Sequence, residues 1–240
     1  MGDFLTPTKT FTTPNGVVVK QKMIPGSQRP NKLLNTPGNK PLWITIHNTA
    51  DIDEAAGTND AEQYARATFN NRMNGVFVHF YIDETDCWHI LPLNEVGYHA
   101  DDFWRADGGN RTSIAIEIIE ETGKLAKDIE AEDRGARLAA WLLHQYGLGI
   151  DRLTTHQHWN GKYCPYFILP HWAEFKAKVE QYMKELEKPA AAMPAAPEAP
   201  TTTSGKHYRV QVGYFGVKEN AETMLKKLKA DGYDAFIREE

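Results

Sequence analysis

Residues 155–165 bring together, over a short stretch, the side chains best able to do chemistry. They are the imidazoles of His156 and His158, the amine of Lys162 and the thiol of Cys164. Neutral imidazole and thiolate are ligands that zinc prefers, and a catalytic zinc site takes three protein ligands while leaving a fourth position to water. His156 and Cys164 supply two donors, and His47 is the natural third. From spacing alone, polar loop histidines and a small buried cysteine explain the segment equally well.

Two alternating segments must position these donors. Residues 42–47 and 112–119 alternate apolar and polar side chains, which predicts two strands. Their expected core faces carry Leu42, Ile44, Ile46, Ile114, Ile116 and Ile118, and the opposite faces carry Thr45, His47, Ser113, Ala115 and Glu117. The first strand therefore presents a histidine at its end, and the second presents a small, acidic face.

The other predicted elements complete an α/β fold. Further strands are predicted at residues 76–82 and 87–91, and helices from about Asn59, over 131–146 and over 172–186. Asn59 and Glu62 have the spacing of a capping box, and Gly147 is expected to end the second helix. The last segment repeats apolar residues at three- and four-residue steps. The predicted architecture is a mixed central β-sheet flanked by helices.

Composition excludes several classes of protein. With 41% hydrophobic and 25% charged residues, the 240-residue chain has the balance of an ordinary globular protein. The 27 basic and 32 acidic side chains leave a formal net charge of -5, which does not favour a nucleic-acid partner. No apolar run approaches the ~18 residues of a membrane span, and the first 25 residues have no signal-peptide pattern, so neither membrane insertion nor export is expected.

Residues 188–206 mark the clearest boundary. They hold four prolines and six alanines, followed by a threonine-rich stretch, which is typical of a semi-extended linker. The expected organisation is a domain over 1–187, this linker, and a small βαβ unit over 207–240, whose helix is predicted at 219–230.

Four blocks of sequence carry a resemblance to a known family. They are WITIHNTA at 43–50, VGYHA at 96–100, GNRTSIAIEI at 109–118 and HQHWNGKYCP at 156–165. In this order they resemble the zinc-dependent N-acetylmuramoyl-L-alanine amidases of the type-2 amidase family, which are related to peptidoglycan-recognition proteins. The closest similarity is to endolysins and autolysins of Gram-positive bacteria and their phages, over roughly residues 17–187.

The resemblance implies roles for individual residues. Its zinc ligands correspond to His47, His156 and Cys164, so the implied cofactor is Zn²⁺. The catalytic carboxylate corresponds to Glu117, the family's lysine to Lys162, and a histidine that lines the substrate groove to His99. A solvated strand-edge carboxylate and a solvent-facing loop lysine remain the alternatives for Glu117 and Lys162.

Several residues stay ambiguous. Val78 stands where some relatives have a tyrosine, so the resemblance assigns proton transfer to Glu117. If residues 156–158 are extended, His158 shares a face with His156 and both could approach the metal. The resemblance favours Cys164 as the ligand, and His158 then either supports the site or the substrate groove or has only a surface role. His79 is interpreted as a hydrogen-bonded sheet histidine and Cys87 as a core thiol.

The tail carries a second resemblance. VQVGYF at 210–215 resembles the motif of the sporulation-related (SPOR) wall-binding repeat, but residues 207–240 have only about half its length. So short a unit leaves a sheet edge and an apolar face uncovered, which suggests pairing of two tails in a homodimer. A truncated, partly disordered tail is the alternative.

The chain is therefore predicted to be a peptidoglycan hydrolase that cleaves the amide between N-acetylmuramic acid and L-alanine. The rival functions are a non-catalytic peptidoglycan-recognition protein and a structural-zinc scaffold. The expected location is the bacterial cytoplasm, followed by action on the cell wall after holin-mediated release or lysis. Phage or bacterial origin, host and stem-peptide preference cannot be read from the sequence.

Overall fold

The chain divides into two compact units, Met1–Ala192 and Met193–Glu240. The computed structural model describes residues 4–49, 60–103 and 105–187, together with Lys218, Glu222, Leu225 and Ile237. Lys218, Glu222 and Leu225 are helical, in or next to the predicted tail helix, whereas the predicted tail strands and the linker lie outside the described residues. Within the described ranges, no helix combines the length and apolar character needed to cross a membrane.

The first unit is built on a seven-stranded sheet with the order β1-β2-β5-β4-β6-β3-β7. The strands are β1 (Lys9–Thr12), β2 (Val18–Gln21), β3 (Trp43–Asn48), β4 (Phe80–Ile82), β5 (Cys87–His89), β6 (Ser113–Ile118) and β7 (Leu153–Thr155). The helices are α1 (Ala61–Phe69), α2 (Gly109–Thr112), α3 (Ala126–Tyr146), α4 (His156–Asn160) and α5 (Trp172–Glu187), with 3-10 turns η1 (Pro37–Asn39), η2 (Ile150–Arg152) and η3 (Leu169–His171). Parallel and antiparallel pairs both occur, which confirms the predicted mixed sheet.

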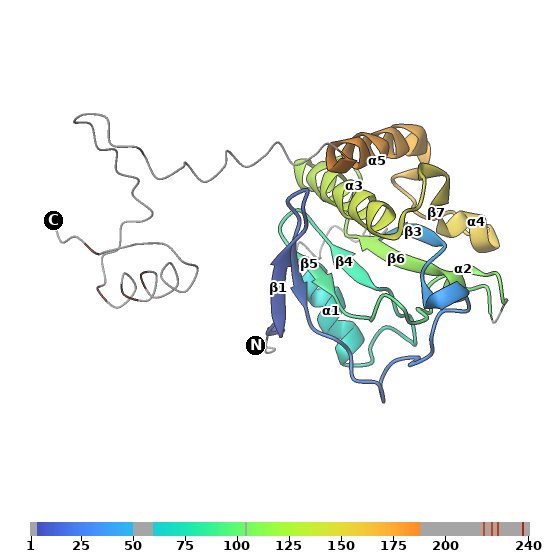
Figure 1. The fold of residues 1–240 in the computed structure, drawn as a ribbon, viewed down its shortest axis with the longest axis horizontal. Helices are drawn as coiled ribbons and strands as arrows, with labels where there is room; N and C mark the ends of the chain where they lie inside the picture. The colour runs from blue at the N-terminus through green and yellow to red at the C-terminus, as the bar shows by residue number, and fades with distance from the viewer. Residues whose placement is uncertain are drawn as a thin grey trace, which may run out of the picture. The chain divides into compact units, whose positions relative to one another are not determined.

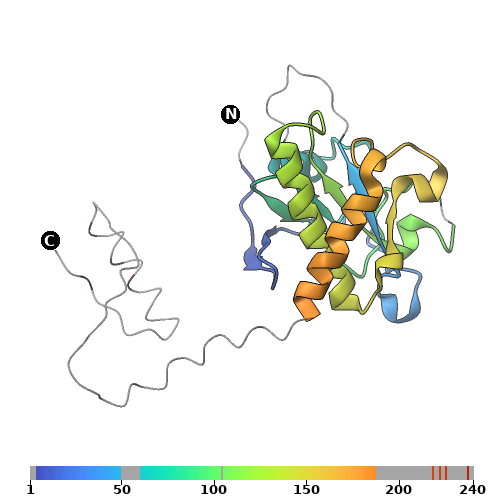
Figure 2. The ribbon, with the colours of Figure 1, turned by 90° about the horizontal axis from the view of Figure 1, so that it is seen from above.

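Helices cover both faces of this sheet. Helices α3 and α5 lie on one face and α1 on the other (Figure 1). Figure 2 shows α3 and α5 side by side over the sheet. The larger core cluster lies under α3 and α5 and includes the isoleucines of β3 and β6, whereas a smaller cluster under α1 includes Tyr81 and Ala115.

Helix α3 shows why the sheet and its cover fit closely. A Cβ on Gly135 would clash with the side chain of Ile118, so glycine lets the helix approach β6 without displacing that side chain. Gly147 ends the helix in the left-handed conformation, as predicted. The helix begins at Ala126, earlier than predicted, because its first turn is polar and is stabilised by Asp128, which accepts a hydrogen bond from Leu125 N at 3.1 Å.

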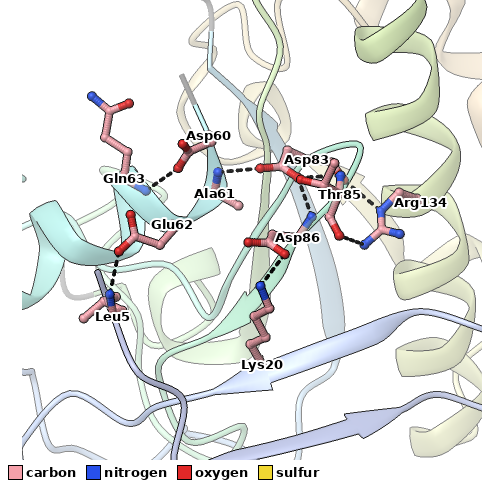
Figure 3. A network of polar contacts seen from close by, with 10 residues as sticks. All are labelled: Leu5, Lys20, Asp60, Ala61, Glu62, Gln63, Asp83, Thr85, Asp86 and Arg134. Atoms are coloured by element: carbon pink, nitrogen blue, oxygen red, sulfur yellow. Dashed lines mark hydrogen bonds and ion pairs between the residues drawn. The ribbon is translucent and has the colours of Figure 1, made fainter. Parts of the chain in front are cut away.

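The start of α1 differs from the prediction. The N-cap is Asp60, which accepts from Gln63 N at 2.6 Å, and Asn59 lies outside the described residues. Glu62 accepts a hydrogen bond from Leu5 N at 2.7 Å (Figure 3). A second carboxylate, that of Asp83, takes the N–H of Ala61 at 2.7 Å. The helix start is therefore held by a distant turn, which local sequence does not reveal.

The short elements were the hardest to predict from sequence. Strands β1, β2 and β7 and helix α4 are all missing from the prediction. The predicted strand at 76–82 is regular only from Phe80, because Phe77 N bonds instead to Tyr98 O at 2.9 Å. Strands of three or four residues carry too few alternations to be distinguished from loop.

Candidate metal centre and active site

Three side chains that sequence places far apart meet in one buried cluster. The donor atoms of His47, His156 and Cys164 lie within 4.8 Å of one another, and all three side chains are buried. They border a cavity of about 600 Å³. The prediction that these three residues come together is consistent with this geometry.

Strand register explains the meeting of the two histidines. Strands β3 and β7 run parallel with Ile46 opposite Thr155, so His47 and His156 are the next residues at neighbouring strand ends. Cys164 lies close to His156 because the next residue, Gln157, donates its backbone N–H to the carbonyl oxygen of Cys164 at 3.0 Å. The site therefore lies at the carboxyl edge of the sheet, the usual position of sites in sheets with parallel strands.

A directed hydrogen-bond chain fixes the protons behind His47. Trp159 Nε1 can only donate, and it donates to Thr45 Oγ1 at 3.0 Å; Thr45 in turn donates to Ser113 Oγ at 2.8 Å. Ser113 gives its own proton to the carbonyl of Gly109 at 2.8 Å. Ser113 Oγ can therefore only accept from His99 Nε2, which lies 3.3 Å away.

This chain determines which nitrogen of His47 is left for a ligand. Because His99 Nε2 carries the proton, its Nδ1 accepts from His47 Nε2, at 3.0 Å. The lone pair of His47 Nδ1 then faces Cys164 Sγ at 3.7 Å. Zinc bonds of about 2.1 Å to nitrogen and 2.3 Å to sulfur in a tetrahedral shell separate the two donors by about 3.6 Å. The observed spacing fits a shared zinc ion.

His156 presents its other nitrogen. Its Nε2 is buried and has no hydrogen-bond partner among the described residues. The ring also forms a hydrogen bond with the backbone of Ala100. Because Nε2 has no partner, the ring nitrogen in this bond is Nδ1. A buried polar atom without a partner is costly unless something else satisfies it. A metal ion is the natural partner for this nitrogen.

Burial sets the protonation of the donors. It holds the pKa of His47 and of His99 well below 6.5, and together with the charge of Lys162 it lowers the pKa of His156 to about 4. Both metal-facing histidines are therefore neutral near pH 7, as metal binding requires. Burial, reinforced by Glu117, raises the pKa of the Cys164 thiol to about 12, so a metal would have to displace its proton.

Glu117 and Lys162 lie at the same cavity. Glu117 is paired with His47 in the β3–β6 register, so the two side chains share one face of the sheet. Burial raises the pKa of Glu117 to about 8, and the positive charge of Lys162 opposes that rise. Lys162 itself is exposed and lines the cavity from the loop before Cys164.

The structure separates the two histidines predicted to bind substrate. His99 borders the cavity but is buried behind His47. His158 is exposed, is absent from the cavity lining, and packs with Trp43 at a ring separation of 5.6 Å. Residues 156–158 begin α4 and are not extended, and residues two apart on a helix point in nearly opposite directions, so His158 does not share a face with His156.

The two remaining sulfur and imidazole predictions are confirmed. His79 is fully buried and uses both ring nitrogens, with Nδ1 accepting from Ala115 N at 3.1 Å and Nε2 donating to Glu95 O at 2.9 Å. Cys87 is a free, buried thiol in the core under α3 and α5.

Sequence reasoning missed other residues at this cavity. They include Asn48, Tyr64, Tyr81, Tyr98 and Asn110. Tyr81 pairs with Glu117 in the β4–β6 register, and its hydroxyl lies 3.0 Å from Thr68 Oγ1. Burial raises the pKa of Tyr81, so the phenol stays protonated. In the sequence, His79 and Tyr81 alternate with Phe80 and Ile82 of the larger core cluster, and this alternation could have indicated that Tyr81 lies on the opposite face of the sheet.

Comparisons with known proteins point to one family. The family described as N-acetylmuramoyl-L-alanine amidase matches residues 37–167. The SPOR domain family matches residues 176–239, a range that includes most of α5. The N-acetylmuramoyl-L-alanine amidase CwlA of Bacillus subtilis (strain 168) is 33% identical over 185 residues, covering 75% of this chain and 65% of that protein. XlyA of the same strain is 38% identical over 148 residues, covering 60% of this chain and 47% of that protein. This chain thus spans about half to two thirds of these relatives.

Solved structures agree with the sequence comparisons. The catalytic domain of XlyA has a TM-score of 0.57 at 34% identity, covering 67% of this chain and 98% of that one. PlyL has a TM-score of 0.57 at 27% identity, covering 67% of this chain and 96% of that one. The amidase match alone covers more than half of the 240 residues. With this fold and this cluster of donors, the chain belongs to the N-acetylmuramoyl-L-alanine amidase family.

Proposed function

We propose that this chain hydrolyses the amide bond between N-acetylmuramic acid and L-alanine in peptidoglycan, with a zinc ion held by His47, His156 and Cys164. The observation that carries the proposal is an open set of three buried donors beside a carboxylate in one cavity. Membership of the amidase family supports the substrate class.

The donor set favours a catalytic over a structural zinc. A structural site is closed by four protein ligands, whereas three ligands leave a position for water. Among the described residues, the metal-type cluster contains three donors. When bound, zinc would act as a Lewis acid and lower the pKa of a bound water.

Glu117 is the proposed general acid and base. Burial raises the pKa of Glu117 and the charge of Lys162 opposes that rise, and a nearby zinc ion would oppose it further, so the carboxylate can take a proton from the attacking water and return it to the departing amine. Its pairing with His47 supports this role, because it places the carboxyl group on the face that carries the donors. Lys162 supplies a positive charge at the cavity for the developing oxyanion.

The tail and location complete the proposal. Residues 207–240 are proposed to bind the cell wall as a half SPOR-like unit, joined by the linker at 188–206 to the catalytic domain at 1–187; the SPOR match supports wall binding. We propose that the enzyme reaches its substrate after holin-mediated release or lysis. Pairing of the tails into a homodimer also stays a proposal. His99 and His158 remain proposed substrate-binding residues, with the burial of His99 favouring a role behind His47.

Digestion of purified cell walls tests the activity. The expected products are new amino-terminal alanines without new reducing sugar ends. Glu117→Gln should bind zinc but release few alanines, whereas the exposed Glu130→Gln control should match the unchanged chain. Binding of wall fragments with no released alanine by the zinc-loaded chain would contradict the proposal and favour a recognition protein.

A further inference from the structure

Asn110 makes two short hydrogen bonds to one dipeptide beside the metal-type cluster. Its Oδ1 accepts from the backbone N–H of His99 at 2.7 Å and from that of Ala100 at 2.8 Å. The side chain is buried and belongs to the short helix α2. One amide oxygen therefore fixes two consecutive peptide groups.

The same dipeptide holds both imidazole donors. His99 Nδ1 accepts the Nε2 proton of His47, with the two nitrogens 3.0 Å apart. The backbone of Ala100 bonds to the ring of His156, whose Nε2 has no partner in the part of the chain that the structure describes. The groups that orient the two histidines are thus adjacent in the chain and share the Asn110 anchor.

We propose that Asn110 is a positioning residue for the metal centre. By fixing the His99–Ala100 dipeptide, it keeps the protons on Nε2 of His47 and Nδ1 of His156 and so aims the opposite nitrogen of each ring at the metal. This role rests on the proposed zinc site. It does not require Asn110 to touch metal or substrate.

The rest of the Asn110 environment explains why an asparagine is suited to this place. Its own backbone N–H donates to Asp102 Oδ2 at 3.3 Å, and its Nδ2 lies 3.4 Å from the carbonyl of Phe103. These contacts tie the loop after Ala100 to α2. Both are longer than the two Oδ1 contacts, so the amide oxygen carries the main anchoring role.

Two variants separate positioning from a merely structural role. Asn110→Ala removes the acceptor and should weaken zinc binding about 10- to 100-fold, the usual range for residues that orient metal ligands. Asn110→Asp keeps an acceptor oxygen and should restore most of the affinity. Asn35→Ala is the matched control, because it also removes an amide-to-backbone contact, with Ala106 O at 3.1 Å, but from a loop that touches neither histidine.

The experiment uses the full chain, with zinc affinity measured by chelator competition and ring protonation by long-range ¹H–¹⁵N NMR of the metal-free protein. The unchanged chain should carry protons on His47 Nε2 and His156 Nδ1, and Asn110→Ala should give a mixture of tautomers at both rings. Opposite tautomers in the unchanged chain would overturn the proposal even if Asn110→Ala failed to fold. A variant with lower thermal stability but unchanged affinity and ring signals would also overturn it. Neither readout depends on peptidoglycan cleavage, so failure of the proposed activity would be seen separately.

Discussion

Two polar clusters in this domain, one around the buried carboxylate of Asp83 and one around the three candidate metal donors, differ in whether their buried polar atoms all have hydrogen-bond partners. The Asp83 cluster comprises Asp83, Thr85, Asp86 and the groups that bind them from α1 and α3 (Figure 3). Asp83 Oδ1 accepts from Thr85 N at 2.7 Å and Thr85 Oγ1 at 3.0 Å, Oδ2 accepts from Ala61 N at 2.7 Å, and the backbone carbonyl accepts from Arg134 Nε at 2.8 Å. In the metal-type cluster, by contrast, His156 Nε2 is buried without a partner in the described part of the chain.

The contrast separates a structural role from a functional one. A buried carboxylate whose two oxygens are both bonded stabilises the elements that it joins, here α1, α3 and the turn between β4 and β5. A buried ring nitrogen without a hydrogen-bond partner costs stability, and beside two further metal-type donors a bound ion would offset that cost. The following changes should therefore affect metal binding in one cluster and folding in the other.

Cys164→Ser should have the largest effect, with loss of most zinc and most activity. A hydroxyl is a far weaker zinc ligand than a thiolate. Zinc per chain by elemental analysis, together with release of alanine from cell walls, measures both. Full zinc occupancy and normal turnover in this variant would remove Cys164 from the site.

Glu117→Gln and Glu117→Ala should keep zinc and lose about 10²-fold or more in rate, the scale expected for a general acid and base. The loss should appear in turnover, because Glu117 is not one of the three clustered donors. Near-normal hydrolysis would mean that another group at the cavity, such as Lys162, is the general acid and base.

Asp83→Ala should lower the stability of the fold without affecting zinc binding. It leaves the buried N–H of Ala61 and the less buried N–H groups of Thr85 and Asp86 without their acceptor, which should lower the free energy of unfolding by about 1 to 3 kcal/mol. Zinc per folded chain should not change. Urea unfolding and zinc content, measured on the same sample, check both parts; loss of zinc with unchanged stability would break the distinction between the clusters.

Glu120→Gln should change how stability depends on pH. Burial, with help from Glu132 and Asp128, raises the pKa of Glu120 from 4.5 to about 9. The folded state therefore holds a proton that the unfolded state releases, and stability falls as pH rises from 4.5 to 9, by at most about 1.4 kcal/mol per pH unit for this group. Glutamine cannot ionise, so urea unfolding at pH 5, 7 and 9 should show a smaller decline in the variant. Equal declines would contradict the raised pKa.

Removal of residues 188–240 should have the smallest effect on the site. The shortened chain should keep its zinc, because the three donors lie in the first unit. If the tails pair, light scattering should show a concentration-dependent dimer for the full chain only. A full chain that stays monomeric at tens of micromolar would contradict pairing.

The long elements and the three candidate metal donors could be predicted from the sequence, but the residues that position those donors could not. Strands β3 and β6 alternate clearly, and the structure brings together His47, His156 and Cys164, the three residues that the resemblance implies as ligands. Strands β1, β2 and β7, of three or four residues each, escaped prediction because their sequences are too short to show a period. Contacts such as Asn110 to the His99–Ala100 dipeptide depend on tertiary structure, and nothing in the spacing of these residues reveals them.

His158 shows the same limit within the site. An extended segment would have placed it beside His156, but α4 begins at His156 and turns His158 toward Trp43. A five-residue helix has no capping signal strong enough to be read from sequence. Backbone conformation, rather than residue type, decides which of the two histidines can reach the metal.

Cobalt substitution tests the central claim, that His47, His156 and Cys164 form a catalytic metal centre, most directly. Apo-protein titrated with Co²⁺ should bind one ion per chain and show thiolate-to-cobalt charge-transfer absorption, which Cys164→Ser should abolish and the core variant Cys87→Ser should leave unchanged. Absence of stoichiometric binding, or a thiolate band that survives Cys164→Ser, would contradict the account.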